Sequence, residues 1–153
     1  MKNSAYQLFA LLLITVSLAA CSNDVIYKNI AQLSYGTSFG ECIGYCNHDV
    51  TIKSKAATYQ CYSWNPAQQI LTKDTILKSS AVDSINSINT TSFFKLPETI
   101  GCPDCADGGA EWLEIILFNG KKHKVTFEYR NEPTQLKNQI IKLREILSKN
   151  ECR

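Results

Sequence analysis

The sequence predicts an α+β domain, in which an antiparallel sheet of four or five strands carries two helices on one face. Three observations support this prediction. Short runs of β-branched and aromatic residues alternate with turn residues in the first half of the chain, residues 112–130 alternate like a β-hairpin, and the end of the chain has one apolar stripe at helical spacing. An all-β barrel with a trailing helix is the alternative.

Three strands are expected in the first half of the chain, and a short further strand is an option there. An apolar, β-branched run predicts the first of them, and a loop with glycine at every fourth position follows. A polar turn at Ser54-Lys55 joins the next two strands, and Asn65-Pro66 ends that unit. The expected ranges are 25–35 for the first strand, 36–46 for the loop, 50–53 and 57–64 for the next two strands, and 75–78 for a short fourth.

Two helices are expected. Ser80 and Asp83 approximate a capping box before apolar residues at near-helical spacing, which predicts a helix over residues 81–90. A second helix is predicted over residues 133–150, with Pro133 in its first turn. Its single apolar stripe must be buried against the sheet, and consists of Leu136, Ile140, Leu143 and Leu147.

The hairpin over residues 112–130 allows two registers. A two-residue turn at Asn119-Gly120 would mix apolar and charged side chains on each face of the hairpin. A three-residue loop over residues 118–120, with Gly120 in the left-handed conformation, instead gives one mostly apolar face and a cross-strand ion pair on the other. This preferred register pairs Leu113 with Val125, Ile115 with His123 and Glu114 with Lys124.

Residues 1–20 have the pattern of a signal peptide. An apolar run follows Lys2, is too short to span a bilayer, and ends in Leu18-Ala19-Ala20-Cys21. A cysteine at this place resembles the lipobox of bacterial lipoproteins, which implies cleavage before Cys21, a diacylglyceryl thioether on its sulfur and membrane attachment through that lipid. The residue after Cys21 is Ser22 and not the aspartate that retains lipoproteins of enteric bacteria in the inner membrane. This favours the outer membrane of the bacterial cell envelope. The alternative is a conventional secretory signal with an ordinary Cys21.

The remaining chain fits a tether over residues 21–24 and one globular domain over residues 25–153. The chain has 16 basic and 14 acidic side chains, and one of these lysines lies in the signal peptide. Because these charges nearly balance, the composition lacks the excess of basic residues that is typical of nucleic-acid-binding domains. The basic cluster at residues 121–124 is interpreted as a solvated hairpin tip.

Six cysteines remain after Cys21, and an even number in an exported chain predicts disulfide bonds. We expect the two loop segments that hold four of them to be joined to each other, and Cys61 to pair with Cys152. The six candidates are Cys42, Cys46, Cys61, Cys102, Cys105 and Cys152.

Three sharper interpretations of these segments remain as alternatives. Cys102-Pro103-Asp104-Cys105 resembles the active-site tetrapeptide of glutaredoxins, although the two glycines after it would break the helix that activates such a thiol. A zinc site could be formed by four cysteines whose spacings are acceptable for such a site, Cys42, Cys46, Cys102 and Cys105. Asp104, Asp107 and Glu111 could offer carboxylates to calcium, but their spacing departs from an EF-hand loop. No cofactor or metal is expected.

The sequence contains no catalytic constellation. The two histidines, His48 beside Asp49 and His123 in the hairpin, are not linked to a nucleophile by a known spacing. There is no nucleophile elbow around a serine and no phosphate-binding glycine loop. We therefore do not expect an enzyme.

Residues 34–46 (SYGTSFGECIGYC) and 101–112 (GCPDCADGGAEW) resemble segments of uncharacterised envelope lipoproteins of Bacteroidota-type bacteria. The resemblance implies a single lipoprotein domain and supplies no catalytic residue. We expect a non-catalytic binding or accessory domain that contacts another envelope protein or a ligand through a loop bearing Tyr35, Phe39 and Tyr45. A thiol-disulfide redox protein that uses Cys102 and Cys105 is the alternative.

Overall fold

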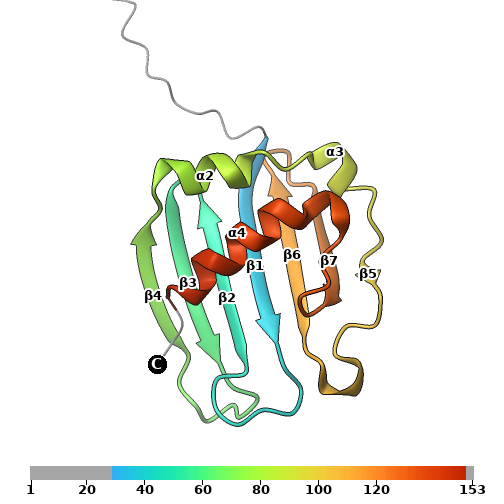
Figure 1. Cartoon of the computed structure of the whole chain (residues 1–153). Helices are drawn as coiled ribbons and strands as arrows, with labels where there is room; N and C mark the ends of the chain where they lie inside the picture. The colour runs from blue at the N-terminus through green and yellow to red at the C-terminus, as the bar shows by residue number, and fades with distance from the viewer. Residues whose placement is uncertain (1–28, 151–153) are drawn as a thin grey trace, which may run out of the picture.

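A seven-stranded sheet is the framework of the structure, a computed structural model that describes residues 29–150 (Figure 1). The strand order is β4-β3-β2-β1-β6-β7-β5, and neighbours are antiparallel except for the parallel pair β5–β7. The sheet is open, so the barrel alternative is wrong. The strands are β1 (Ile30–Ser38), β2 (Asn47–Lys53), β3 (Ala56–Tyr62), β4 (Leu71–Ile76), β5 (Thr99–Ile100), β6 (Ala110–Leu117) and β7 (Lys122–Glu128).

Three α-helices, counted over residues 29–150, complete an α+β fold: α2 (Ser79–Asn86), α3 (Thr90–Phe93) and α4 (Lys137–Ser148). Figure 1 shows α4 crossing one face of the sheet, with α2 and α3 along the end where β1 begins. The fold class is confirmed, but the expected numbers of strands and helices were too small. Two short 3₁₀ turns, η1 (Cys105–Asp107) and η2 (Thr134–Leu136), join the main elements.

The predicted helix over residues 81–90 is two helices. The Asn89 side chain accepts a hydrogen bond from the Ser92 backbone N–H, at 3.1 Å, and so caps a new helix. The predicted capping box is wrong, because Ser80 lies inside α2 and the residue before that helix, Lys78, makes no side-chain cap.

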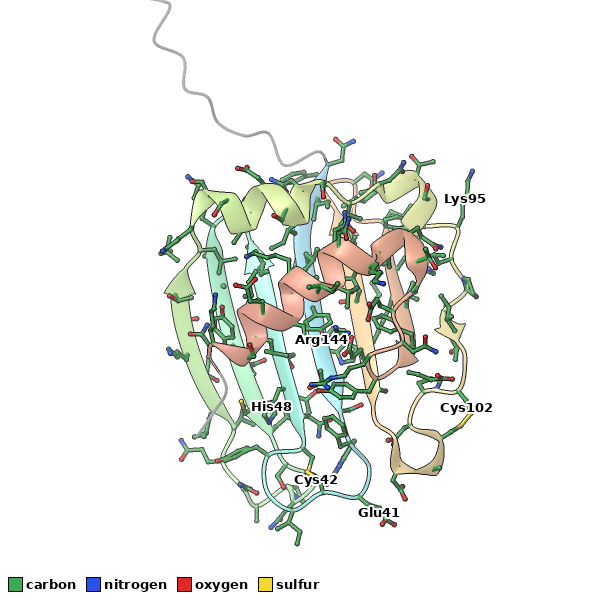
Figure 2. The ribbon with its side chains drawn as sticks, in the orientation of Figure 1. Glu41, Cys42, His48, Lys95, Cys102 and Arg144 are labelled. Atoms are coloured by element: carbon green, nitrogen blue, oxygen red, sulfur yellow. A yellow bond between two sulfur atoms is a disulfide. The ribbon has the colours of Figure 1, made fainter. Side chains whose placement is uncertain are left out.

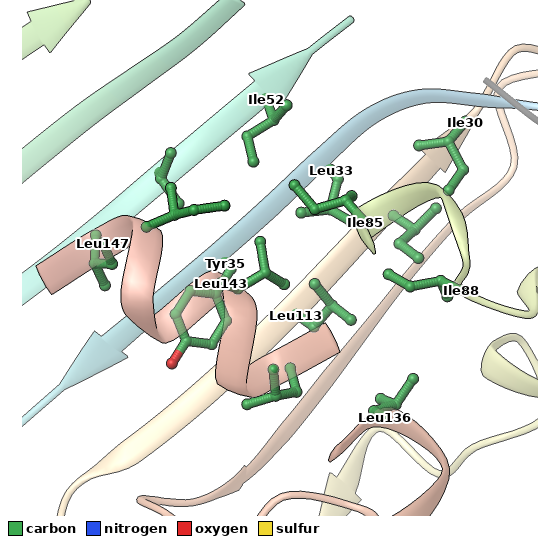
Figure 3. Packing of buried hydrophobic residues seen from close by; sticks show 14 of the residues in the cluster. Ile30, Leu33, Tyr35, Ile52, Ile85, Ile88, Leu113, Leu136, Leu143 and Leu147 are labelled. Carbon is green, nitrogen blue, oxygen red and sulfur yellow. The ribbon is translucent and has the colours of Figure 1, made fainter. Parts of the chain in front are cut away.

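The core lies between the sheet and the helices. All four residues of the predicted C-terminal stripe are buried, and together with Ile146 they cover Tyr35, Leu113 and their neighbours on the sheet (Figure 3). Tyr35, Tyr59, Phe93 and Phe127 are among the largest fully buried side chains. Burial of these side chains is the main contribution to the stability of the fold.

The preferred hairpin register is confirmed. Leu113 pairs with Val125 and Glu114 with Lys124, and the loop closes through a Leu117 N–H to Lys121 carbonyl hydrogen bond of 2.8 Å. Gly120 has the expected positive φ, +82°.

The expected ion pair between Glu114 and Lys124 is not among the salt bridges of the described residues. The Lys124 ammonium instead stands 4.2 Å from the centre of the Trp112 ring, because that ring lies on the same face and attracts a cation.

An ion-pair network fixes α4 to the sheet (Figure 2). Glu111 on β6 is fully buried, and both of its oxygens accept hydrogen bonds from Arg144, at 3.0 and 2.9 Å. Arg144 also donates to Glu132 at 2.8 Å, in the connection between β7 and α4. These contacts link three segments that are far apart in the sequence.

Candidate functional site: the loop end

Three loops lie together at the end of the sheet where β1 finishes, and we call this region the loop end (Figure 2). They are the β1–β2 loop (residues 39–46), the β3–β4 loop (residues 63–70) and the β5–β6 loop (residues 101–109). The antiparallel order brings the first two together, and the parallel β5–β7 pair brings the third to the same end. The described chain begins at residue 29, at the opposite end of β1.

The first two loops are bonded to each other. A disulfide joins Cys42 to Cys46 and closes the β1–β2 loop. The Trp64 indole N–H donates to the Phe39 carbonyl at 2.8 Å, and the Tyr45 hydroxyl donates to the Gln69 carbonyl at 3.2 Å. The β3–β4 loop therefore holds the β1–β2 loop near both of its ends.

The third loop is bonded to the first through Asp104. Its carboxylate accepts hydrogen bonds from the Gly40 N–H, at 3.4 Å, and from the Gly109 N–H, at 3.2 Å. A Cβ at Gly109 would overlap the Phe39 ring, so this glycine is needed for close approach of the two loops. Phe39 also packs edge-on against Tyr129, with 4.9 Å between ring centres.

The β5–β6 loop has an unusual backbone. Asp104, Ala106 and Asp107 all have positive φ, between 51° and 61°. Such conformations cost about 1–3 kcal/mol each and persist where the surroundings impose them. Here the Cys102–Cys105 disulfide and the Asp104 hydrogen bonds impose them, so the loop has a defined shape.

Exposed apolar side chains project from this framework. Ile43 is fully exposed at the tip of the β1–β2 loop, and Trp64 and Ile70 are 57% and 54% exposed at the two ends of the β3–β4 loop. The three loops contain the acidic residues Glu41, Asp104 and Asp107 but neither lysine nor arginine. The loop end is therefore apolar and acidic.

The predicted binding residues are only partly in this site. Tyr35 was wrongly placed in the loop: β1 continues to Ser38, so Tyr35 faces α4 and is fully buried. Burial and the nearby Glu111 carboxylate raise the pKa of its hydroxyl. Phe39 and Tyr45 do lie in the loop end, where they are half-buried and support the loops. Sequence reasoning missed Ile43, Trp64 and Ile70.

The predicted joining of the two cysteine segments is wrong. Each pair closes within its own segment, because the Cα atoms are 5.7 Å apart for Cys42–Cys46 and 5.5 Å apart for Cys102–Cys105, within disulfide range. The four-cysteine zinc site is thereby lost. Cys61 also takes part in a disulfide. Its pairing with Cys152 stays a prediction, since Cys152, like Cys21, lies outside the described residues.

The residues of the calcium and redox alternatives lie in or beside the β5–β6 loop. Over residues 29–150 no three His, Cys, Asp or Glu side chains are grouped as metal ligands, and Glu111 points to Arg144 and away from the acidic loop. Cys102 and Cys105 lie in a turn interrupted at Ala106, whereas an activated C-x-x-C thiol lies at a helix N-terminus.

Both histidines contact backbone carbonyls. The Nε2 atom of His48 lies 2.7 Å from the backbone carbonyl oxygen of Tyr45, and the Nε2 atom of His123 lies 2.9 Å from that of Leu96. Asp49 is buried on the sheet face opposite the helices. Burial raises its pKa to about 6, partly offset by Lys124 and His48.

No protein-family model matches this chain. A comparison with curated proteins likewise finds no match. The resemblance of residues 34–46 and 101–112 to envelope lipoproteins therefore stays a prediction. None of the helices within residues 29–150 is long and apolar enough to cross a bilayer.

Proposed function

We propose that this protein is a lipid-anchored lipoprotein of the bacterial outer membrane, and that its domain is a non-catalytic module that binds another envelope protein through the loop end. The observation that carries the proposal is the set of exposed side chains Ile43, Trp64 and Ile70, held by loops that are bonded to each other. Loops on a rigid scaffold are a common site of recognition.

Pre-organisation supports a binding role. Ordering flexible loops during association costs affinity, and loops already fixed by disulfides and hydrogen bonds avoid most of that cost. Trp64 combines a large apolar surface with an indole N–H that is already bonded to the Phe39 carbonyl. Residues of this kind often dominate the free energy of protein association.

The chemistry of the loop end indicates the chemistry of its partner. Glu41 and Asp107 are exposed beside the apolar side chains, and no basic residue in the loops neutralises them. A partner surface with an apolar pocket and lysine or arginine at its rim would be complementary. Such charges mainly raise the association rate, so binding should weaken with added salt.

A lipid anchor on Cys21 and a binding site at the loop end are compatible with a single orientation of the domain relative to the membrane. A lipid on Cys21 would attach the domain near residue 29, and the loop end lies at the other end of β1. The binding surface would then face away from the membrane.

Site-specific photo-cross-linking in the native cell envelope tests this proposal. A benzophenone amino acid replaces Ile43 or Trp64, and the matched control is the same replacement at Ile141, an exposed isoleucine on α4. We expect one discrete protein cross-linked from both loop positions and not from the control position. Equal cross-linking from all three positions, or none from the loops, would contradict the proposal.

The redox alternative makes a different prediction. A redox protein would show rapid alkylation of Cys102 or Cys105 at neutral pH after mild reduction, with the domain still folded. A binding module with structural disulfides would release no free thiol to the same mild reductant until urea unfolds the domain. Thiol counting with and without urea distinguishes the two functions.

A further inference from the structure

Exposed lysines gather at the end of the domain opposite the loop end, and we call this region the basic end. They come from the β2–β3 turn, the segment before α2, the segment after α3, and the tip of the β6–β7 hairpin. Two acidic residues lie in the same region, Asp83 on α2 and Glu98 in the segment after α3. The lysines are Lys53, Lys55, Lys78, Lys95, Lys121 and Lys122.

Two backbone contacts hold segments of the basic end together. The Leu77 N–H donates to the Lys55 carbonyl at 2.9 Å, which brings the start of α2 to the β2–β3 turn. The Phe118 N–H donates to the Asn29 carbonyl, also at 2.9 Å, which brings the hairpin tip to the first described residue. Figure 2 shows Lys95 at this same end, far from Glu41 and Cys42.

A hollow of about 350 Å³ opens within the basic end. Thr90, Thr91, Lys95 and Lys121 are among its lining residues and supply two hydroxyl groups and two ammonium groups. The Lys121 ammonium is held 4.8 Å from the centre of the Phe94 ring. Hydroxyl and ammonium donors around one hollow match the oxygens of a phosphodiester.

The neighbouring hairpin tip is also suited to a membrane surface. Phe118, at that tip, is 73% exposed. An aromatic side chain among lysines is typical of proteins that rest in the headgroup layer of a bilayer. Six exposed lysines against two acidic residues, Asp83 and Glu98, give a nearly neutral chain one cationic end.

We propose that the basic end binds the surface of an anionic phospholipid bilayer, with a lipid phosphate in the hollow and Phe118 in the headgroup layer. The proposed lipid on Cys21 would hold this end close, because the residues between Cys21 and Asn29 reach at most about 30 Å. The binding itself does not require that lipid. A failure of lipidation and a failure of this proposal are therefore distinguishable.

Vesicle sedimentation tests the proposal with the chain over residues 21–153 carrying Cys21→Ser. The probes are vesicles of phosphatidylethanolamine with phosphatidylglycerol, and vesicles of phosphatidylcholine alone. We expect at least about tenfold tighter binding to the anionic vesicles, lost at high salt. Equal binding to both vesicles, or no binding to either, would overturn the proposal.

Charge-matched variants locate the binding surface. Lys95→Glu with Lys121→Glu should weaken binding to anionic vesicles by about tenfold or more. Lys73→Glu with Lys149→Glu changes the net charge equally, on β4 and at the end of α4, and should weaken binding less than about threefold. Unchanged thermal midpoints would show that both variants fold. Equal losses from both pairs would contradict a specific basic end.

The nature of the ligand is tested by competition. Millimolar glycerol phosphate should leave vesicle binding nearly unchanged, because many weak contacts with a bilayer act together. Complete displacement would assign the hollow to a soluble phosphate compound and overturn the membrane proposal. Retention on heparin without vesicle binding would overturn it in favour of a soluble polyanion.

Discussion

Replacing Arg144 with methionine should be among the most destabilising single changes in this domain. Arg144 is the bidentate partner of Glu111, whose side chain is fully buried. Methionine fills much of the space of the arginine stem but provides no hydrogen bond. The Glu111 carboxylate would keep the backbone N–H of Arg130, at 3.3 Å, but no cation.

The magnitude follows from the asymmetry of the pair. Removing one partner of a buried ion pair costs about 3–5 kcal/mol, because the other charge stays buried without compensation. Arg144→Met should therefore cost about 3–4 kcal/mol. Glu111→Gln should cost only about 1–2 kcal/mol, because Arg144 keeps Glu132 and its side chain is 25% exposed. The double variant should cost less than the sum of the two single changes.

Urea denaturation measures these differences in the free energy of unfolding. A cost below about 1 kcal/mol for Arg144→Met would refute the reasoning, since it falls well under the range for a broken buried pair. A larger cost for Glu111→Gln than for Arg144→Met would refute it as well.

Three further predictions concern other parts of the chain. The folded pKa of Asp49, about 6, lies above the ordinary value of 3.8, so stability should fall as pH rises through this window. Asp49→Asn should therefore stabilise the domain at pH 8 by about 1–3 kcal/mol and have no effect at pH 4, as measured by urea denaturation. Gly120→Val should lower the free energy of unfolding by about 1–2 kcal/mol; a Cβ there meets no atom within 4 Å, so the cost comes from the positive φ and not from a clash. The control Lys121→Val should cost less than about 0.5 kcal/mol, and equal thermal midpoints for the two variants would contradict this prediction. Cys21→Ser should abolish palmitate labelling and leave the precursor unprocessed, and unchanged labelling would exclude the lipobox.

The sequence allowed those elements to be predicted whose signal is local. The C-terminal helix follows from one apolar stripe, and the hairpin register follows from the parity of alternating residues around Gly120. The prediction placed only the end of β4 and omitted β5, and both errors have a physical reason. Residues 71–74 of β4 are mostly polar because this is an edge strand, and β5 has only two residues, held by pairing with β7.

The candidate site was less predictable because it depends on topology. Tyr35 was assigned to the loop because β1 was expected to end at residue 35, three residues too early. Trp64 was assigned to a strand, although β3 ends at Tyr62 and Trp64 lies in the β3–β4 loop. The isolated Ile43, flanked by Cys42 and Gly44, was a visible signal of an exposed apolar tip.

The clustering of lysines at the basic end also depends on topology. The lysines of the basic end are distributed between residues 53 and 122, so the nearly neutral composition concealed them. The disulfides depend on a choice that composition does not determine, because two adjacent cysteine segments can close locally or across to each other. Here both described pairs close locally.

The affinity of the partner cross-linked from Ile43 tests the central claim most directly. The purified partner is titrated against wild type, Ile43→Ser and the control Ile141→Ser, each at low and high salt. Binding through the loop end predicts at least about tenfold weaker affinity for Ile43→Ser, less than about twofold change for Ile141→Ser, and weaker binding at high salt for every form. Equal affinities for Ile43→Ser and wild type would contradict the claim that this protein binds its partner through the loop end.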